Sequence, residues 1–358
     1  MTARLLSIAT NVPAGGMSQA LAAELAAHVA GFSPRRARAV RTLYERSGIE
    51  RRGLVVADEQ GRQEFYIRNG EPAGPTTAAR MAAYADACVP LALPACREAL
   101  ELARVLPREV THVVLASCTG FDAPGADQAI IHALGLPTTV RRTLIGFMGC
   151  HAAINALAVA KAFADADPHA VVLVCCVEVC SLHFSYTDEP GHTLANALFA
   201  DGAAAAVVRA SPREHDADSP TILSTSSILL PDSADCMSWH IGDAGFQMRL
   251  SARVPELLAS HVPAWIDACL TRQGLARADI GGWAIHPGGP RVVTAVQQAL
   301  GLPQERVEAS LSVLREHGNM SSPTVLFILK RLWDSGIPRP WVGMAFGPGL
   351  AGEGVVVG

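Results

Sequence analysis

Three polar residues, each placed where a predicted element begins or ends, can together supply nucleophilic chemistry: Cys150, His286 and Asn319. Cys150 lies in the sequence GFMGCHAAINALAVAKAF, between a short strand-like run and an Ala-rich helix that we expect to reach about Ala164. The N-terminus of a helix offers unpaired backbone N–H groups and the positive end of the helix dipole, and both favour a thiolate. We therefore expect a lowered pKa for Cys150; a core cysteine that packs the helix start is the alternative.

His286 ends a predicted buried strand, Gly282–Ile285, and is followed by the sequence Pro-Gly-Gly-Pro, which interrupts that strand. Side chains at strand ends are the ones that meet ligands in α/β proteins. A histidine there can pair with a thiolate or donate a hydrogen bond to a developing oxyanion. A structural histidine is the alternative interpretation.

Asn319 follows Gly318 and opens a further predicted helix. Its amide can donate to a substrate oxygen, but an N-cap role is the simpler explanation for an asparagine at this position. His317, two residues earlier, is a second candidate for a catalytic histidine. It ranks below His286 because it precedes a turn and does not end a buried strand.

The bulk composition limits the class of protein. The chain has 358 residues, of which 50% are hydrophobic and 17% charged, and its net charge is −4. A chain of this length usually folds around more than one core. Its nine cysteines are irregularly spaced without a CxxC pair, so we expect free thiols and no metal site. The charge balance gives no sequence-wide signal for nucleic acid, and the basic cluster in residues 35–52 suits only a few phosphates.

The sequence also predicts no membrane span, because it has no uninterrupted apolar run of about 18 residues. Its first residues, MTARLLSIATNVP, have one early arginine and a short apolar run, unlike a signal peptide. We therefore expect a cytoplasmic protein.

Strands and helices alternate along the chain. Two predicted strands, His112–Ser117 and Ala170–Cys176, are apolar throughout, as in strands buried on both faces of a sheet. Residues 76–102 form a long predicted helical stretch, which Pro90 and Pro94 are expected to bend or split.

The alternation is interrupted once and then repeats. Residues 210–220 are polar, contain two prolines and form the best linker candidate. We divide the chain into two halves, 1–212 with the cysteine and 213–358 with the histidine and asparagine. Together these patterns predict an α/β fold with helix layers around mixed sheets.

Seven segments of the chain, spread over nearly its whole length, resemble the type III polyketide synthases, the chalcone synthase family of the thiolase superfamily. They read CTGFDAPGADQAI at 118–130, GFMGC at 146–150, ALFADGAAAAVV at 197–208, LPDSADCMSWHIGDAGF at 230–246, HPGGP at 286–290, GNMSS at 318–322 and FGPGLAGE at 346–353. GNMSS together with FGPGL is the most specific part. The resemblance implies a thiolase-like fold of two duplicated halves in an α/β/α/β/α arrangement.

The resemblance also implies an activity. In that family the cysteine takes a starter acyl group from an acyl-CoA, malonyl-CoA is decarboxylated, and the resulting carbanion attacks the acyl thioester. Repetition gives a poly-β-keto chain that cyclises in the same cavity. Carried over, Cys150 is the nucleophile, His286 activates it, and His286 and Asn319 stabilise the enolate. No metal or organic cofactor is implied, since coenzyme A thioesters are substrates.

Further site residues follow from the same motifs. Phe199 matches one gatekeeping phenylalanine of the family; Met248 stands where the second is expected, with Phe246 close by. The matching cavity wall comprises Cys118, Ala123, Cys180, His183, Phe199, Trp239, Met248 and Ser321. The coenzyme A-binding candidates are Arg41, Arg46, Arg51 and Arg291, for which solvated surface positions are the alternative.

The departures from the plant pattern bear on the substrate. Trp239 stands where the plant enzymes have glycine and fills the space left there for an aromatic starter. This resembles bacterial enzymes that make alkylresorcinols or alkylpyrones from fatty acyl starters, whereas Cys118 resembles enzymes that build tetrahydroxynaphthalene from malonyl units alone. We expect a fatty acyl starter. The family also implies a homodimer, with the loop around Ala123 reaching across the interface.

Two other functions remain open from the sequence. One is a chain-initiating β-ketoacyl synthase that takes malonyl groups from acyl carrier protein. The other is a non-catalytic member of the fold that binds acyl-CoA.

Overall fold

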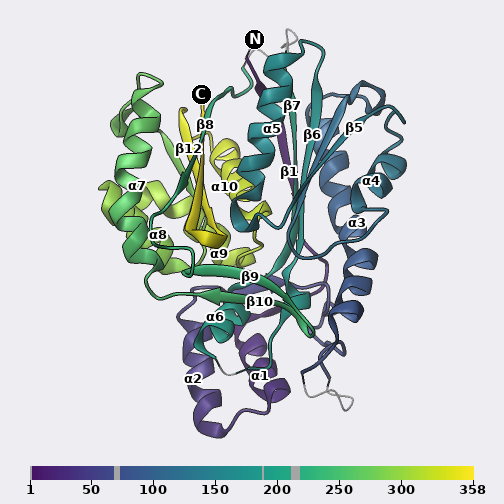
Figure 1. Ribbon diagram of the computed structural model, residues 1–358, viewed down its shortest axis with the longest axis vertical. Coiled ribbons are helices and arrows are strands. Elements are labelled where there is room, and N and C mark those ends of the chain that lie inside the picture. Colours follow the sequence, from purple (N-terminus) through teal and green to yellow (C-terminus); the bar gives the residue numbers. More distant parts are fainter. Residues whose placement is uncertain (1, 68–72, 188, 211–217) are drawn as a thin grey trace.

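The computed structural model describes residues 2–67, 73–187, 189–210 and 218–358, and its main strands form two mixed sheets (Figure 1). The first has the order β1-β7-β6-β4-β5, with bounds Arg4–Asn11, Asp201–Arg209, Val171–Val179, His112–Ser117 and Arg141–Gly146. The second has the order β11-β12-β13-β8, with bounds Gly282–Ile285, Trp341–Gly347, Ala351–Val357 and Ile222–Leu229. Neighbours β6, β4 and β5 are parallel, as are β11 and β12, and the other pairs are antiparallel.

Helices form three layers around these sheets. Between the sheets lie α5 (Ala152–Ala166) and α10 (Pro323–Asp334), whose buried side chains share one core with both sheets. The outer face of the first sheet is covered by α3 (Thr77–Leu102), followed by α4 (Ala126–Leu134). The second is covered by α7 (Val254–Thr271) and α8 (Pro290–Leu300), and α9 (Glu308–His317) packs beside α10. The expected thiolase-like α/β/α/β/α arrangement is confirmed.

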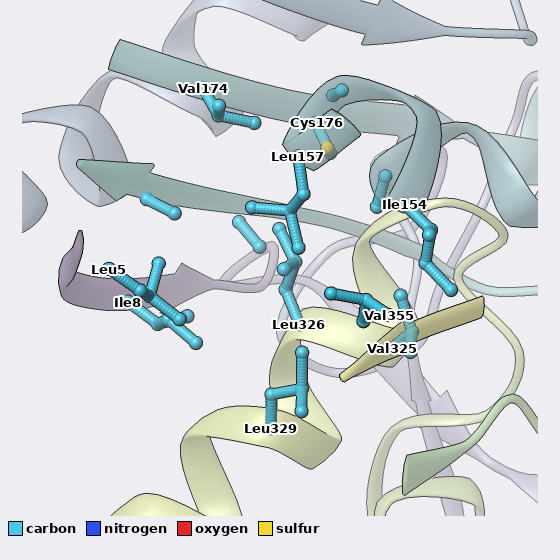
Figure 2. Packing of buried hydrophobic residues seen from close by; sticks show 14 of the residues in the cluster. Leu5, Ile8, Ile154, Leu157, Val174, Cys176, Val325, Leu326, Leu329 and Val355 are labelled. Atoms are coloured by element: carbon cyan, nitrogen blue, oxygen red, sulfur yellow. The ribbon is translucent and has the colours of Figure 1, made fainter. Parts of the chain in front are cut away.

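The central layer explains how two distant halves meet. Figure 2 shows Leu157 of α5 and Leu326 of α10 packed between Leu5 of the first sheet and Val355 of the second. Every second or third residue of α5 is alanine, so the helix brings little side-chain bulk and the two sheets approach it closely. The cysteine and the asparagine lie just before α5 and α10, so this packing brings them together.

A smaller group of elements closes one end of the sheets (Figure 1). It contains the hairpin β9 (Met237–Gly242) and β10 (Gly245–Leu250), the short pair β2 (Gly16–Ser18) and β3 (Arg51–Gly53), and the helices α1 (Gln19–Ala30), α2 (Pro34–Glu45) and α6 (Pro190–Leu198). Short 3₁₀ turns span Pro107–Glu109, Gly149–His151, Cys180–His183, Arg277–Asp279, Gln304–Val307 and Pro348–Leu350. Among the described residues, no helix has the length and apolar character needed to cross a membrane.

The structure excludes one of the two expected effects of the prolines and adds a hairpin that the sequence analysis missed. The stretch with Pro90 and Pro94 is one continuous helix, α3, and is not split. Packing of one face of α3 against the sheet outweighs the lost backbone hydrogen bonds. The hairpin β9–β10 was not predicted, because its strands carry polar and apolar residues without the continuous apolar runs used to recognise the core strands.

Candidate active site

Cys150 lies in the 3₁₀ turn Gly149–His151, immediately before α5, and is buried. Gly149 has a φ of +78°, which a glycine adopts readily. A Cβ at this position would lie 2.4 Å from Cδ of Pro348, so only glycine lets the chain pass here. The local sequence therefore holds the cysteine in one place, two residues before α5 and not at its first residue as expected.

His286 follows β11 and stays anchored to the second sheet, because its N–H donates to the carbonyl oxygen of Met344 at 2.8 Å. Its side chain is buried, and neither ring nitrogen has a hydrogen-bond partner among the described residues. A buried polar group without a partner is rare in folded proteins and often marks a functional site.

Asn319 lies between α9 and α10. It is not the N-cap of α10, which begins at Pro323 with Ser322 before it, so that alternative is wrong. Instead, its Oδ1 accepts a hydrogen bond from the N–H of Ser321 at 2.8 Å. This bond orients the amide so that Nδ2 is the donating group, and Asn319 hydrogen-bonds the Cys150 thiol.

The three residues line one cavity. Cys150, His286 and Asn319 share it with Phe199 and Met248. Cys150 also lines an adjoining cavity with Cys118, Cys180, Trp239 and Ser321. Phe199 and Met248 line both of these cavities and a third, larger one, so they lie at the junction of all three.

Burial controls the charge states of the pair. It raises the pKa of Cys150 to about 11, and the nearby Glu178 carboxyl also raises it. Hydrogen bonds from Ser321 and Asn319 lower the pKa but do not offset burial. Burial, with a smaller contribution from His151, lowers the pKa of His286 to about 3. The expected lowering of the cysteine pKa is therefore wrong for the free protein, because desolvation outweighs the helix dipole. At neutral pH the site holds a thiol and a neutral imidazole.

Glu178 is a buried carboxyl in this site that was not predicted. It accepts hydrogen bonds from the N–H of Cys118 (2.8 Å), the hydroxyl of Thr119 (2.8 Å) and the hydroxyl of Ser322 (2.6 Å). Burial raises its pKa to about 7, against these hydrogen bonds. The sequence feature that could have identified Glu178 is that it is the single carboxylate in the apolar strand VVLVCCVEV. A carboxylate buried in such a strand must find hydrogen-bond partners inside the protein.

Comparison with known families decides the identity of this arrangement. Residues 1–212 match the N-terminal domain of chalcone and stilbene synthases, and residues 221–358 match their C-terminal domain. The chain belongs to the chalcone and stilbene synthase family. It is a type III polyketide synthase, an acyltransferase-type enzyme that uses malonyl-CoA.

Known relatives of this synthase match it along nearly its whole length. It is 32% identical over 355 residues to the alpha-pyrone synthesis polyketide synthase-like Pks18 of Mycobacterium tuberculosis, covering 98% of this chain and 89% of that protein. It is 31% identical over 328 residues to the 3,5-dihydroxyphenylacetyl-CoA synthase of Streptomyces toyocaensis, covering 89% and 82%. The solved type III domain of Steely1, a type I/III hybrid from Dictyostelium, superposes with a TM-score of 0.92 at 28% identity, covering 100% and 99%.

Most of the expected cavity residues of the synthase line its cavities. Cys118 and Ser321 lie beside Cys150, His183 and Phe246 line the larger cavity, and Cys180 and Trp239 line both, with Phe199 and Met248 at the junction. Ala123 is the exception. It is exposed, in a surface loop, and lines none of the three cavities within the single chain. Its place in the wall, where the family has this loop reach across a homodimer interface, stays a prediction.

Hydrogen bonds fix the wall of the synthase beside Cys150. The indole N–H of Trp239 donates to the carbonyl oxygen of Cys118 at 2.9 Å. The N–H of Phe246 donates to Nδ1 of His183 at 3.0 Å, so Nε2 carries the proton and donates to the carbonyl oxygen of Thr119 at 2.6 Å. Burial lowers the pKa of His183 to about 4, so it stays neutral. His183 supports the wall and has no ring nitrogen free for chemistry.

The remaining candidates lie outside the cavities. Arg41, Arg46 and Arg51, on and after α2, and Arg291, in the first turn of α8, are exposed. Arg291 is adjacent to Val292, which lines the cavity with Cys150. The His317 ring meets the Phe327 ring edge to face, with 5.2 Å between the ring centroids. It lines none of the three cavities, which favours His286 as the candidate catalytic histidine.

Proposed function

We propose that Cys150, His286 and Asn319 form the catalytic triad of this type III polyketide synthase. The observation that carries the proposal is their convergence on one buried cavity with apolar walls. In the loading step, the neutral His286 imidazole accepts the Cys150 proton, and the sulfur attacks the thioester carbonyl of an acyl-CoA. The bond from the acyl carbon to the coenzyme A sulfur breaks, and the coenzyme A thiol leaves with a proton.

In the extension step, malonyl-CoA loses carbon dioxide and leaves an enolate whose negative charge rests on the thioester oxygen. The Asn319 Nδ2 group, oriented because Oδ1 accepts from Ser321, and the N–H of the neutral His286 imidazole donate to this oxygen. The enolate carbon then bonds to the acyl carbon, and the bond from that carbon to the Cys150 sulfur breaks. The reaction needs no metal or organic cofactor, so EDTA is expected to leave the rate unchanged.

The two steps are separable by mutation. Cys150→Ser is expected to abolish the mass increase of the acyl-enzyme. Asn319→Ala is expected to keep that mass increase but to slow malonyl-CoA decarboxylation by about 100-fold or more, as loss of an oxyanion donor does elsewhere. Product formed by Cys150→Ser at the wild-type rate would contradict the proposal.

For the starter we propose a fatty acyl group. The larger cavity is lined by apolar residues of α1 and of the loop that follows β3, including Leu25, Ala26, Val29 and Leu54. It shares the lining residues Phe199 and Met248 with the two cavities that contain Cys150. The product we propose is an alkylresorcinol, alkylpyrone or related aromatic polyketide.

A chain-length series tests the starter. Ala26→Phe fills the far part of the larger cavity and is expected to reduce kcat/KM for dodecanoyl-CoA about tenfold or more, while acetyl-CoA is unaffected. Ala20→Phe, on the exposed side of the same helix, is the matched control. Equal effects on both starters, or no effect of Ala26→Phe, would show that the acyl chain does not occupy this cavity. Mass spectrometry of the products assigns the ring.

We also propose a homodimer formed along β5, which lies at the edge of the first sheet. Leu144 of β5 is 57% exposed, and Phe121 and Met148 are 40% and 39% exposed. The Phe121 ring contacts β5 at Gly146, where a Cβ would lie 3.0 Å from it, so these apolar groups adjoin an unpaired strand edge. Ala123 belongs to the same loop as Phe121.

Light scattering after size exclusion measures this assembly. We expect a dimer for the wild type and a monomer for Leu144→Asp. Leu229→Asp, at an exposed position of the edge strand β8, is the matched control and should remain dimeric. A monomeric wild type, or a dimeric Leu144→Asp, would contradict the proposal.

A further inference from the structure

The surface around α2 is strongly basic. Residues 34–52 contain seven arginines and two glutamates, a net charge of +5 in a chain whose net charge is −4. Five of these arginines are exposed: Arg35, Arg38, Arg41, Arg46 and Arg51. None of the five forms an ion pair with a described residue, whereas Arg62 and Arg331 elsewhere on the surface pair with carboxylates.

This arrangement opposes the stability of the helix. Arg35, Arg38 and Arg41 are spaced three residues apart on α2 and therefore share one face. Like charges at this spacing repel, and Arg35 in the first turn also opposes the helix dipole, which no acidic residue there offsets. Charge that is unfavourable for the helix and exposed to solvent is typical of a surface that receives an anionic partner.

The basic face lies beside a helix that lines the cavity of Cys150. Helices α2 and α6 pack side by side, and Nη2 of Arg36 donates to the hydroxyl of Thr193 on α6 at 3.2 Å (Figure 1). Two residues further along α6, Ala195 and then Leu198 line the cavity that contains Cys150. A partner bound on α2 is therefore next to a helix that walls this cavity.

The extent of the charge exceeds what one coenzyme A requires. Its three phosphates can be met by Arg41, Arg46, Arg51 and Arg291, the residues already assigned to them. Arg35 lies in the first turn of α2 and Arg38 one turn further on, whereas Arg46 and Arg51 follow the other end of this helix, which is about 18 Å long at 1.5 Å per residue. They suit a wider anionic surface.

We propose that Arg35 and Arg38 dock an acidic acyl carrier protein, which delivers the starter on its phosphopantetheine arm. This arm is chemically the same as that of coenzyme A, so the cavity and the nucleophile need no change. The Cys150 sulfur bonds to the acyl carbon, the bond from that carbon to the phosphopantetheine sulfur breaks, and that sulfur takes the proton lost by Cys150. The inference rests on the function proposed for Cys150.

The test compares two forms of one starter. The enzyme receives octanoyl-CoA or an octanoyl-loaded bacterial acyl carrier protein, each with malonyl-CoA as extender. We expect the double variant Arg35→Glu/Arg38→Glu to reduce kcat/KM for the octanoyl carrier protein about 10- to 100-fold and for octanoyl-CoA less than about twofold. The matched control is Arg104→Glu/Arg108→Glu, an equal charge change at the C-terminal end of α3, and thermal unfolding checks that all variants fold.

Each other outcome overturns the docking surface. Equal losses with both starters assign Arg35 and Arg38 to coenzyme A, and no loss with either removes them from loading altogether. The docking surface is also contradicted if the wild type does not use the octanoyl carrier protein as a substrate. A third contradicting result is that the wild type sediments with phosphatidylglycerol vesicles, the double variant does not, and turnover of the carrier protein is unchanged. If the wild type turns over neither starter, the function proposed for Cys150 fails instead.

Discussion

Asn319 and Phe199 are 120 positions apart in the sequence, yet their backbones lie side by side as a parallel bridge. The N–H of Asn319 donates to the carbonyl oxygen of Leu198 at 2.9 Å, and the N–H of Ala200 donates to the carbonyl oxygen of Asn319 at 2.8 Å. Nη1 of the buried Arg52 donates to the carbonyl oxygen of Phe199 at 2.7 Å. The proposed oxyanion donor and the residue at the cavity junction are thus held by one set of bonds.

Gly318 is where this bridge is most sensitive. Its φ is +75° and its ψ −168°, and a Cβ there would lie 3.0 Å from Cγ of Arg52 and 3.1 Å from the carbonyl oxygen of Leu198. We expect Gly318→Ala to lower the free energy of unfolding by about 1–3 kcal/mol and to reduce kcat, because the bridge must shift. Gly301→Ala, at a φ of +69° with open space around it, carries the backbone strain alone and should keep kcat. Urea unfolding measures the free energy of unfolding of the two variants, and steady-state kinetics measure kcat. Equal kcat values in both variants would contradict the prediction.

Glu178 is expected to control the reactivity of Cys150, since its charge raises the pKa of the thiol. In Glu178→Gln, an amide oriented with Nε2 toward Ser322 keeps the other hydrogen bonds. Removal of the negative charge should speed alkylation of Cys150 by iodoacetamide about 3- to 10-fold, the effect of half to one pKa unit. Because the pKa of Glu178 is about 7, the difference should appear above pH 7 and vanish well below it. Mass spectrometry of the Cys150 peptide measures the rate, and a difference independent of pH would refute the electrostatic explanation.

His183 should make the fold sensitive to acid. Its pKa is about 4 in the folded protein and about 6.5 when unfolded, so the unfolded chain binds its proton first. The stability that the neutral ring provides is present above pH 6.5 and is lost as the pH falls toward 4. Between pH 7 and pH 5 this loss is about 2 kcal/mol.

We expect His183→Gln to be less stable than the wild type at pH 7 but to lose less stability on going to pH 5. Urea unfolding at the two pH values measures the difference. Raised pKa values at Glu178 and Asp201 oppose the trend equally in both proteins, so the comparison isolates His183. Parallel pH dependence in the two proteins would exclude this role.

Trp239 is expected to restrict the starter, because it lines both the larger cavity and the one beside Cys150. Trp239→Ala should merge these spaces and raise kcat/KM for an aromatic starter such as benzoyl-CoA relative to octanoyl-CoA. Trp239→Phe keeps an aromatic ring but loses the hydrogen bond to Cys118. Comparing the two variants therefore distinguishes the effect of side-chain size from the effect of the hydrogen bond. The idea fails if both variants keep the wild-type ratio of the two starters.

The sequence by itself determined the class of fold and singled out the residues proposed to react. Apolar strands and alanine-rich helices are local patterns, and Gly149 and Gly318 mark local backbone requirements, so Cys150, His286 and Asn319 stood out before any contact was known. Trp239 and Met248 could likewise be placed in the cavity from the motifs around them.

Only the tertiary structure decided the electrostatics and the connections of the site. The pKa of Cys150 is raised because distant segments exclude water from it, and desolvation depends on what surrounds a group rather than on its own sequence. The bridge between Asn319 and Phe199 joins the two halves, and the partners of Glu178 come from two segments, 118–119 and Ser322. These relationships arise from contacts between residues far apart in the chain, which local sequence patterns do not encode.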